Sequence, residues 1–178
     1  MRKIVVTEFI SLDGVIENPG WTFPYWNDEI AAFKGAETSA SDALLLGRVT
    51  YQGFAAAWPQ SQDEGAEYFN NVRKYVVSTT LDSAEWNNSV LIKDNVAAEI
   101  TAIKQQQGQD IAVHGSARLA LWLMQQGLVD RLHLLVYPVV LGQGQRLFPE
   151  GIPGTLKLAE SKTFSSGVVA LVYELEHS

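Results

Sequence analysis

Residues 43–51 read Ala-Leu-Leu-Leu-Gly-Arg-Val-Thr-Tyr, a short apolar run that ends at a glycine and continues into a mixed segment. The apolar residues predict a buried strand over residues 43–46, because a strand covered on both faces lacks polar alternation. Residues 48–57 predict a helix that ends before Pro59. The stretch is therefore a strand, a glycine corner and a helix in succession.

The same order of features returns farther along the chain, where residues 111–119 read Ile-Ala-Val-His-Gly-Ser-Ala-Arg-Leu. Residues 111–114 predict a buried strand that ends at Gly115, and residues 117–126 predict a helix that stops at Gly127. Alternating strands and helices are typical of proteins whose sheet is mostly parallel. The two junctions therefore predict an α/β fold.

Further strands and helices are predicted on both sides of these junctions. Strands are expected over residues 4–10, 75–78, 90–92, 132–141, 156–164 and 168–174, and helices over residues 28–38 and 96–107. Residues 60–71 are polar and predict a surface loop or an exposed helix. The last two strands flank Ser165-Ser166-Gly167, a turn sequence. We therefore expect a mostly parallel central sheet with an antiparallel C-terminal hairpin.

Length and composition indicate one domain over residues 1–178. Hydrophobic residues make up 47% of the chain and charged residues 19%, which is typical of a globular protein. The N-terminal sequence MRKIVVTEF leads into a strand pattern rather than a signal peptide, and no apolar run reaches the ~20 residues of a membrane span. We therefore expect a cytoplasmic protein with no membrane partner.

Cysteine and histidine usage argues against a metal centre, and the charge argues against nucleic acid. The chain has no cysteine, and His114, His133 and His177 show no metal-ligand spacing. The net charge is −7, and the 13 dispersed Lys and Arg residues do not form the basic surface that a phosphate backbone requires. Neither a metal nor a nucleic-acid partner is expected.

The two junctions have the chemistry of a phosphate-binding site. Each helix N-terminus offers free backbone amides and a positive dipole end, and glycine lets the backbone approach a ligand closely. The arginine and hydroxyl side chains that follow both glycines suit phosphate oxygens. The candidate cofactor-binding residues are Gly47, Arg48, Thr50, Gly115, Ser116, Ala117 and Arg118. Either glycine alone is most simply a turn residue, but the two junctions together favour a diphosphate lying between them.

Hydroxyl side chains at the end of the 75–78 strand bear on the choice of cofactor. Ser78 and Thr79 are candidates to receive an adenosine 2′-phosphate, which distinguishes NADP from NAD. The alternative is an ordinary polar strand end. No G-x-G-x-x-G sequence follows the first strand, so the chain does not fit a Rossmann domain.

The N-terminal half resembles dihydrofolate reductase. The resemblance lies in residues 4–16, 29–34 and 45–51, where Gly47-Arg48-Val49-Thr50 matches the G-R-x-T cofactor motif of that fold. It implies a dihydrofolate reductase-like three-layer fold with NADPH as hydride donor.

The C-terminal half is more similar to the reductase domain of the bifunctional riboflavin-biosynthesis deaminase-reductase. Residues 113–119 carry this similarity, with residues 132–142 and Gly144 behind them. Together the resemblances cover nearly the whole chain and imply a reductase that often forms a homodimer. The deaminase half is absent, because its zinc site needs a His and Cys motif that this chain lacks.

Dihydrofolate reductase carries an acidic residue on the helix after its first loop, and the resemblance places Glu29 there. A carboxylate partly buried among the aromatic residues of 21–26 has its charged form disfavoured, and it can orient a heterocycle or deliver a proton. Glu29 is therefore the candidate catalytic residue. Asp13, Asp28 and a bound water are alternative proton sources, and Asp28 and Glu29 also suit a helix N-terminus without any catalytic role.

The nicotinamide is expected near the end of the first strand, at Thr7, Leu12 and Gly14. Arg146 is a candidate contact for a substrate phosphate, although a surface loop arginine is the simpler interpretation. His114 is expected to be a core histidine, and His133 is expected to face solvent or a partner chain.

The residues and the resemblance together predict an NADPH-dependent reductase of a small pyrimidine- or pteridine-type substrate. By resemblance, the aminouracil phosphate of riboflavin biosynthesis is the first choice of substrate and dihydrofolate is the second. Two alternatives stay open: a non-catalytic module that senses or stores NADP(H), and a plain oligomerisation domain. NADPH binding without turnover indicates the former, and no NADPH binding indicates the latter.

Overall fold

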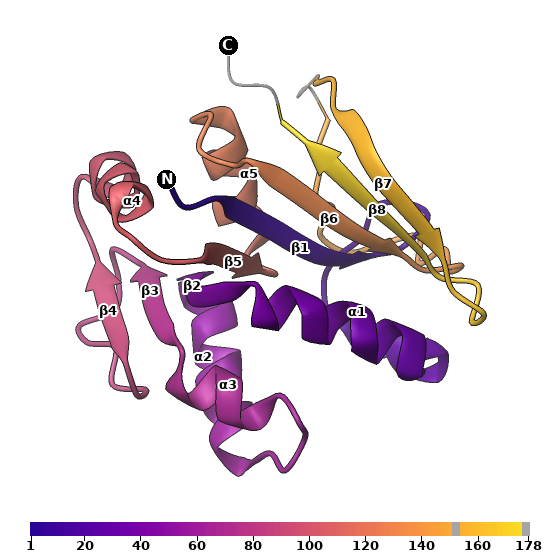
Figure 1. Ribbon diagram of the computed structural model, residues 1–178, viewed down its shortest axis with the longest axis horizontal. Helices are drawn as coiled ribbons and strands as arrows, with labels where there is room; N and C mark the ends of the chain where they lie inside the picture. Colours follow the sequence, from indigo (N-terminus) through magenta and orange to yellow (C-terminus); the bar gives the residue numbers. More distant parts are fainter. Residues whose placement is uncertain (151–153, 176–178) are drawn as a thin grey trace.

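The computed structural model describes residues 1–150 and 154–175, so His177 lies outside the described residues. One mixed sheet runs through the molecule in the order β4-β3-β2-β5-β1-β6-β8-β7 (Figure 1). The strands are β1 (Ile4–Ile10), β2 (Ser41–Gly47), β3 (Arg73–Val77), β4 (Ser89–Ile92), β5 (Asp110–His114), β6 (Arg131–Val136), β7 (Lys157–Thr163) and β8 (Val169–Glu174). β1 to β6 pair in parallel, whereas β8 pairs antiparallel with both β6 and β7. The predicted α/β fold with an antiparallel C-terminal hairpin is confirmed.

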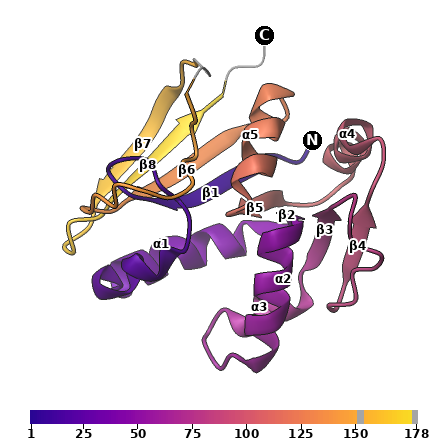
Figure 2. The same cartoon turned by 180° about the vertical axis from the view of Figure 1, so that it is seen from behind.

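Helices cover both faces of this sheet. They are α1 (Asp28–Ser39), α2 (Arg48–Ala57), α3 (Ala66–Asn71), α4 (Val96–Gln105) and α5 (Ala117–Gln125), with 3-10 turns at Pro19–Tyr25 and Trp58–Gln60. α1, α2 and α3 lie on one face, and α4 and α5 lie on the other (Figures 1 and 2). Within residues 1–150 and 154–175, no helix is long and apolar enough to cross a bilayer.

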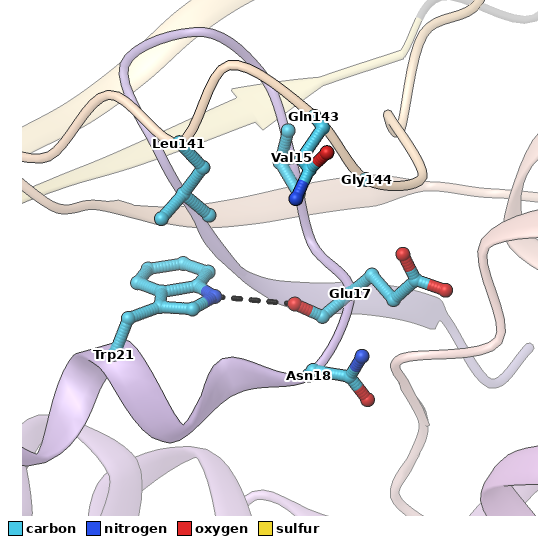
Figure 3. Close-up of a pocket in the computed structure, with 7 residues that line it drawn as sticks. All are labelled: Val15, Glu17, Asn18, Trp21, Leu141, Gln143 and Gly144. Carbon is cyan, nitrogen blue, oxygen red and sulfur yellow. Dashed lines mark hydrogen bonds between the residues drawn. The ribbon is translucent and has the colours of Figure 1, made fainter.

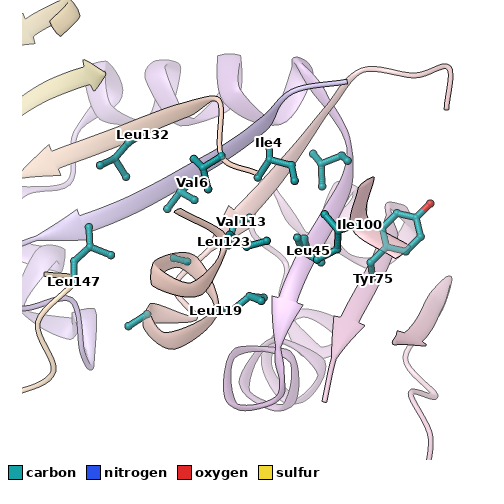
Figure 4. Packing of buried hydrophobic residues seen from close by; sticks show 14 of the residues in the cluster. Ile4, Val6, Leu45, Tyr75, Ile100, Val113, Leu119, Leu123, Leu132 and Leu147 are labelled. Carbon is teal, nitrogen blue, oxygen red and sulfur yellow. The ribbon is translucent and has the colours of Figure 1, made fainter. Parts of the chain in front are cut away.

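The main core lies between the sheet and the pair α4 and α5. Val6 and Val113, from the adjacent central strands β1 and β5, pack there with Leu119 and Leu123 of α5 (Figure 4). On the opposite face, β1 turns its other side chains toward α1, where half-buried Phe9 packs against a second core. This alternation is what a strand buried on both faces requires, and it explains why β1 is apolar except at the buried residues Thr7 and Glu8.

The strand predicted over residues 132–141 is five residues too long at its C-terminal end, because β6 stops at Val136. Its neighbour β1 ends at Ile10, and Val136 is the last residue that pairs with β8. Pro138 follows and has no amide to donate to a neighbouring strand. The chain instead turns toward the loop after β1, where Leu12 N donates to Val139 O at 2.8 Å.

The chain leaves the carboxyl ends of the adjacent strands β2 and β5 in opposite directions. From β2 it passes through α2 to β3, whereas from β5 it passes through α5 to β6 on the far side of the sheet. Ligands of open α/β sheets bind outside the strand ends at such a reversal. The topology therefore marks the place where α2 and α5 begin as a candidate site.

Candidate functional site

The two glycine corners meet at this reversal and are joined by hydrogen bonds. Gly47 N donates to Ser116 Oγ at 3.0 Å, and Ser116 N donates to Thr50 Oγ1 at 3.0 Å. Each bond crosses from one strand-to-helix junction to the other. The structure thus brings together segments that are far apart in sequence, and we use the name junction crevice for the edge of the sheet formed by residues 47–50 and 115–118.

The two corners are closely packed, and Gly115 leaves no room for a larger residue. Gly115 has φ +54°, and a Cβ there would lie 3.1 Å from Thr50 Oγ1. A Cβ on Gly47 would lie 3.4 Å from Ser116 Oγ. Backbone conformation and close approach therefore both favour glycine at position 115, whereas a Cβ at position 47 would make an ordinary contact.

Two helix N-termini open on the junction crevice. The residues that precede α2 and α5, Gly47 and Ser116, make no side-chain hydrogen bond to cap their own helices, and neither helix has an acidic residue in its first turn. The first backbone amides and the positive dipole ends therefore favour an anion. Arg48 and Arg118 are exposed at these same helix starts, while Ala117 is buried beneath them. The arrangement fits a diphosphate, because it offers amides, hydroxyls and guanidinium groups from two sides.

Of the two hydroxyl residues predicted to select NADP, one is buried and already hydrogen-bonded. Ser78 Oγ accepts from Thr80 N at 3.2 Å and from Leu81 N at 3.1 Å, closing the turn after β3. Thr79 is exposed. Since Gly47 pairs with Val77 on the neighbouring strand, this turn lies beside the junction crevice. Ser78 therefore shapes the turn, and Thr79 is the hydroxyl that a ligand can reach.

The three residues predicted to surround the nicotinamide lie along and just after β1. Thr7 pairs with His114 and so lies level with the strand end that leads into Gly115. Its side chain is buried and is hydrogen-bonded to residues of α1. Leu12 and Gly14 lie farther on, in the turn after β1, where Leu12 is 63% exposed and Gly14 has φ +85°.

A buried ionic cluster between α1 and the sheet surrounds the Thr7 side chain. Lys34 Nζ donates to Thr7 Oγ1 at 2.8 Å and forms an ion pair with Glu37, and Thr7 Oγ1 donates to Glu37 Oε2 at 3.0 Å. His133 Nδ1 lies 2.7 Å from Glu37 Oε1. Burial raises the pKa of Glu37, but the Lys34 charge and the hydrogen bonds outweigh it and bring that pKa to about 2.

This cluster corrects the expectation for His133. Its side chain is 15% exposed and points to Glu37 rather than to solvent or a partner chain, because alternate residues of β6 face α1. His114 behaves as predicted for a core residue. It packs against the rings of Phe54 and Phe69, and burial lowers its pKa to about 3, so that it is neutral at pH 7.

Glu29 does not have the environment predicted for a catalytic acid. Its side chain is exposed, and Ser165 donates to Glu29 Oε2 from both its backbone N at 2.7 Å and its Oγ at 2.6 Å. These bonds lower its pKa, whereas partial burial among aromatic rings was expected to disfavour its charged form. The aromatic loop is directed elsewhere, since Trp21 and Tyr25 pack on Tyr137. Glu29 thus fastens the start of α1 to the β7–β8 turn.

The other carboxylates considered as proton sources are also ionised or remote. Ser11 and the backbone amides of Leu141 and Gly142 donate to Asp13 and lower its pKa to about 2. Asp28 is exposed in the first turn of α1. Neither of them is placed at the junction crevice.

Sequence reasoning missed Glu8, a carboxyl group buried in β1 beside the junction crevice. Glu8 is 4% exposed, and among the described residues its Oε1 has no hydrogen-bond partner. Burial raises its pKa well above the usual value, although the Lys34 charge and a hydrogen bond from the Gly115 backbone act in the opposite direction. The available signal was an acidic residue inside a run of otherwise apolar strand residues.

Replacing Glu8 with glutamine should remove a pH-dependent loss of stability. The raised pKa means that the native state holds this proton more tightly than the unfolded chain, so stability falls as pH rises from about 4.5 toward the native pKa. Glutamine matches the protonated carboxyl in shape and has no charge to bury. Urea denaturation of Glu8→Gln and of the exposed control Glu67→Gln across this range measures the effect, and equal pH slopes in wild type and Glu8→Gln would contradict it.

A cavity of about 360 Å³ lies between the loop after β1 and the loop after β6 (Figure 3). Seven residues line it: Val15, Glu17, Asn18, Trp21, Leu141, Gln143 and Gly144. The two loops are fastened together, because Ile16 N donates to Gln145 O at 3.0 Å and Asp13 Oδ2 accepts from Gly142 N at 2.8 Å. Arg146 Nε donates to Asp13 O at 2.9 Å, which is a third hydrogen bond between these two loops.

Two proteins of Bacillus subtilis are similar to this chain over nearly its whole length. The chain is 32% identical to the uncharacterised protein YyaP of Bacillus subtilis (strain 168) over 179 residues, covering 97% of this chain and 94% of YyaP. It is 29% identical to YwjB of the same organism, covering 94% of this chain and 95% of YwjB.

Two solved structures share the fold. A putative riboflavin biosynthesis protein from Shewanella sp. PV-4 superimposes with a TM-score of 0.80 at 18% identity, covering 98% of this chain and 99% of that one. A pyrimidine reductase-like protein from Corynebacterium diphtheriae superimposes with a TM-score of 0.73 at 14% identity, covering 99% and 93%.

The family itself follows from the sequence match. The model of the RibD C-terminal domain matches residues 2–170, which is nearly the whole chain. The resemblance to the riboflavin-biosynthesis reductase domain is thereby confirmed, and the chain belongs to the RibD C-terminal domain family, a family of reductase-type enzymes.

Proposed function

We propose that this chain is an NADPH-dependent reductase of a pyrimidine-type metabolite. The observation that carries the proposal is the junction crevice, where two helix N-termini without side-chain caps are held together by the bonds from Gly47 N to Ser116 Oγ and from Ser116 N to Thr50 Oγ1. Free backbone amides at two adjacent helix N-termini suit a diphosphate. The reductase family to which the chain belongs supports the same assignment.

The chain's own residues would hold and orient the cofactor. The amides at the start of α2 and α5 would bind the diphosphate, with Thr50 and Ser116 fixing the two corners to each other. Arg48 and Thr79, both exposed beside this place, would contact the adenosine 2′-phosphate. Bound NADPH would supply the hydride for a C=N or C=O bond of the substrate.

Proton delivery is best assigned to a bound water. Glu29 has a lowered pKa and two hydrogen bonds from Ser165, so it is ionised at neutral pH and already engaged. A general acid needs a pKa near the working pH. In this proposal Glu29 positions α1 and does not deliver the proton. The riboflavin-type aminouracil is the first substrate to test, and dihydrofolate is the second.

Cofactor titrations test the proposal. We expect NADPH to bind more tightly than NADH, and Arg48→Gln to weaken NADPH binding about tenfold while leaving NADH unchanged, because a charge-assisted phosphate contact is lost. Calorimetry measures the binding, and loss of NADPH absorbance with an aminouracil and dihydrofolate panel measures turnover. Light scattering on the same sample tests the homodimer that the resemblance implies.

Arg73→Gln is the matched control for this experiment. Arg73 is an exposed arginine at the first residue of β3, at the opposite end of the strand from the junction crevice. Its substitution removes the same charge without touching the proposed site. An Arg48→Gln effect that is equal for NADPH and NADH, or equal to that of Arg73→Gln, contradicts the 2′-phosphate contact, and absence of NADPH binding contradicts the whole proposal.

A further inference from the structure

The cavity between the loops after β1 and β6 has two apolar walls. Trp21 and Leu141 face each other across it, and Val15, which is 1% exposed, lines it beside Gln143 (Figure 3). The indole is fixed in place, because Trp21 Nε1 donates to Glu17 O at 3.1 Å and the ring packs edge-on against Tyr137 at 5.5 Å. A fixed aromatic wall opposite an aliphatic wall suits a flat ring.

The remaining lining is polar and carries a negative charge. Asn18 and Gln143 contribute amides, and Glu17 contributes a carboxylate whose Oε2 accepts from Gln145 N at 3.1 Å. A carboxylate has acceptor capacity for several hydrogen bonds, so this contact leaves room for more. None of the described residues that line the cavity is a lysine or an arginine. The lining therefore favours a ligand with N–H donors and disfavours an anion.

Arg146, the nearby arginine considered from sequence as a phosphate contact, lies outside the lining of the cavity. Its Nε donates to Asp13 O, which connects the two loops. Its aliphatic stem lies 3.9 Å from where a Cβ on Gly14 would be.

From these observations we propose that the cavity binds a planar aminopyrimidine edge through Glu17, Asn18 and Gln143, and that it selects heterocycles without a phosphate or carboxylate group. This inference rests on the proposed reductase function only for the reaction that follows binding. The cavity lies on the loop that leaves β1, and β1 also borders the junction crevice at Thr7, so one strand connects the two sites. The ribose phosphate of the aminouracil and the carboxylates of dihydrofolate are both disfavoured by this lining, so the ligand that it favours is an uncharged aminopyrimidine.

Three pyrimidine probes test the selection directly. Calorimetry with 2,4-diaminopyrimidine, orotate and uridine 5′-monophosphate compares a donor-rich ring with a carboxylate and a phosphate. We expect the diaminopyrimidine to bind at least about tenfold more tightly than either anion. Its amino groups can donate to the Glu17 carboxylate, whereas a carboxylate or phosphate on the ligand would be repelled by it. Anions that bind as tightly as the diaminopyrimidine overturn the proposal.

Variants identify the residues responsible. Glu17→Gln should weaken diaminopyrimidine binding about tenfold and reduce the discrimination against orotate, while Glu67→Gln, which removes an exposed charge from α3, should change neither. Trp21→Phe keeps an aromatic wall and should retain binding, whereas Trp21→Ala should lose it. Because Trp21→Ala also removes packing against Tyr137, the Glu17 comparison decides the outcome if that variant fails to fold. Glu17→Gln binding equal to wild type for all three probes overturns the proposal.

An NADPH titration of the same protein separates this inference from the proposed function. Diaminopyrimidine binding without NADPH binding supports the cavity assignment and removes the reductase proposal. NADPH binding without diaminopyrimidine binding overturns the cavity assignment and leaves the reductase proposal standing.

Discussion

Replacing Glu37 with glutamine should lower the free energy of unfolding by about 3–5 kcal/mol, the cost of removing one partner of a buried ion pair. The Glu37 side chain is 9% exposed and that of Lys34 is 15% exposed, so the substitution leaves the ammonium group buried without its counter-charge. It also weakens the contact to His133 Nδ1 that holds β6 to α1. Urea denaturation at neutral pH measures the change as a shift in midpoint.

Two further variants separate charge burial from simple loss of a carboxylate. Glu67→Gln changes an exposed residue of α3 and should alter stability by less than about 0.5 kcal/mol. Lys34→Met in the Glu37→Gln background removes the unpaired charge and should restore part of the loss. A Glu37→Gln variant as stable as the Glu67→Gln control would show that the cluster does not stabilise the fold.

The same cluster predicts how stability depends on acid pH. The pKa of Glu37 is lowered to about 2 from a usual value of 4.5, so its stabilising contribution is complete above about 4.5 and is lost as pH falls toward about 2. The Glu37→Gln variant should lack this part of the acid transition. Its pH profile between these values should therefore be flatter than that of the wild type.

The strand and helix order could be predicted because its signals are local. The apolar run before Gly47 and the turn sequence at Ser165-Ser166-Gly167 each lie within a few residues of the element that they end or connect. The C-terminal limit of β6 could not be predicted in this way. It depends on where the neighbouring strands β1 and β8 end, which the apolar sequence 137–141 does not report.

The same distinction between local signals and distant contacts applies to the residues of the candidate site. The convergence of Gly47 and Gly115 followed from a topological rule, since both corners end parallel strands at the same edge of the sheet. The cluster of Lys34 and Glu37 with Thr7 and His133 joins α1 to β1 and β6 through side-chain contacts, and the sequence shows only that Lys34 and Glu37 share one helix face. Glu29 was misjudged because its partner, Ser165, lies in the distant hairpin turn.

Replacing Gly115 with alanine should raise the dissociation constant of NADPH at least about tenfold. The new Cβ would lie 3.1 Å from Thr50 Oγ1, the atom that accepts from Ser116 N, so Thr50 must move and the bond that joins the two corners is disturbed. Displacement of this bond misplaces the helix amides on which the proposed diphosphate contact depends.

Gly127→Ala is a matched control for backbone strain. Gly127 follows α5 with φ +66°, close to the +54° of Gly115, but a Cβ there meets nothing within 4 Å. Both substitutions should therefore cost about 1–2 kcal/mol of stability for a left-handed alanine, whereas only Gly115→Ala should weaken NADPH binding. Calorimetry on the two folded variants makes the comparison. Equal NADPH affinities would mean that the place where the two corners meet is not the cofactor site, because they would share the strain and differ only in the contact with Thr50.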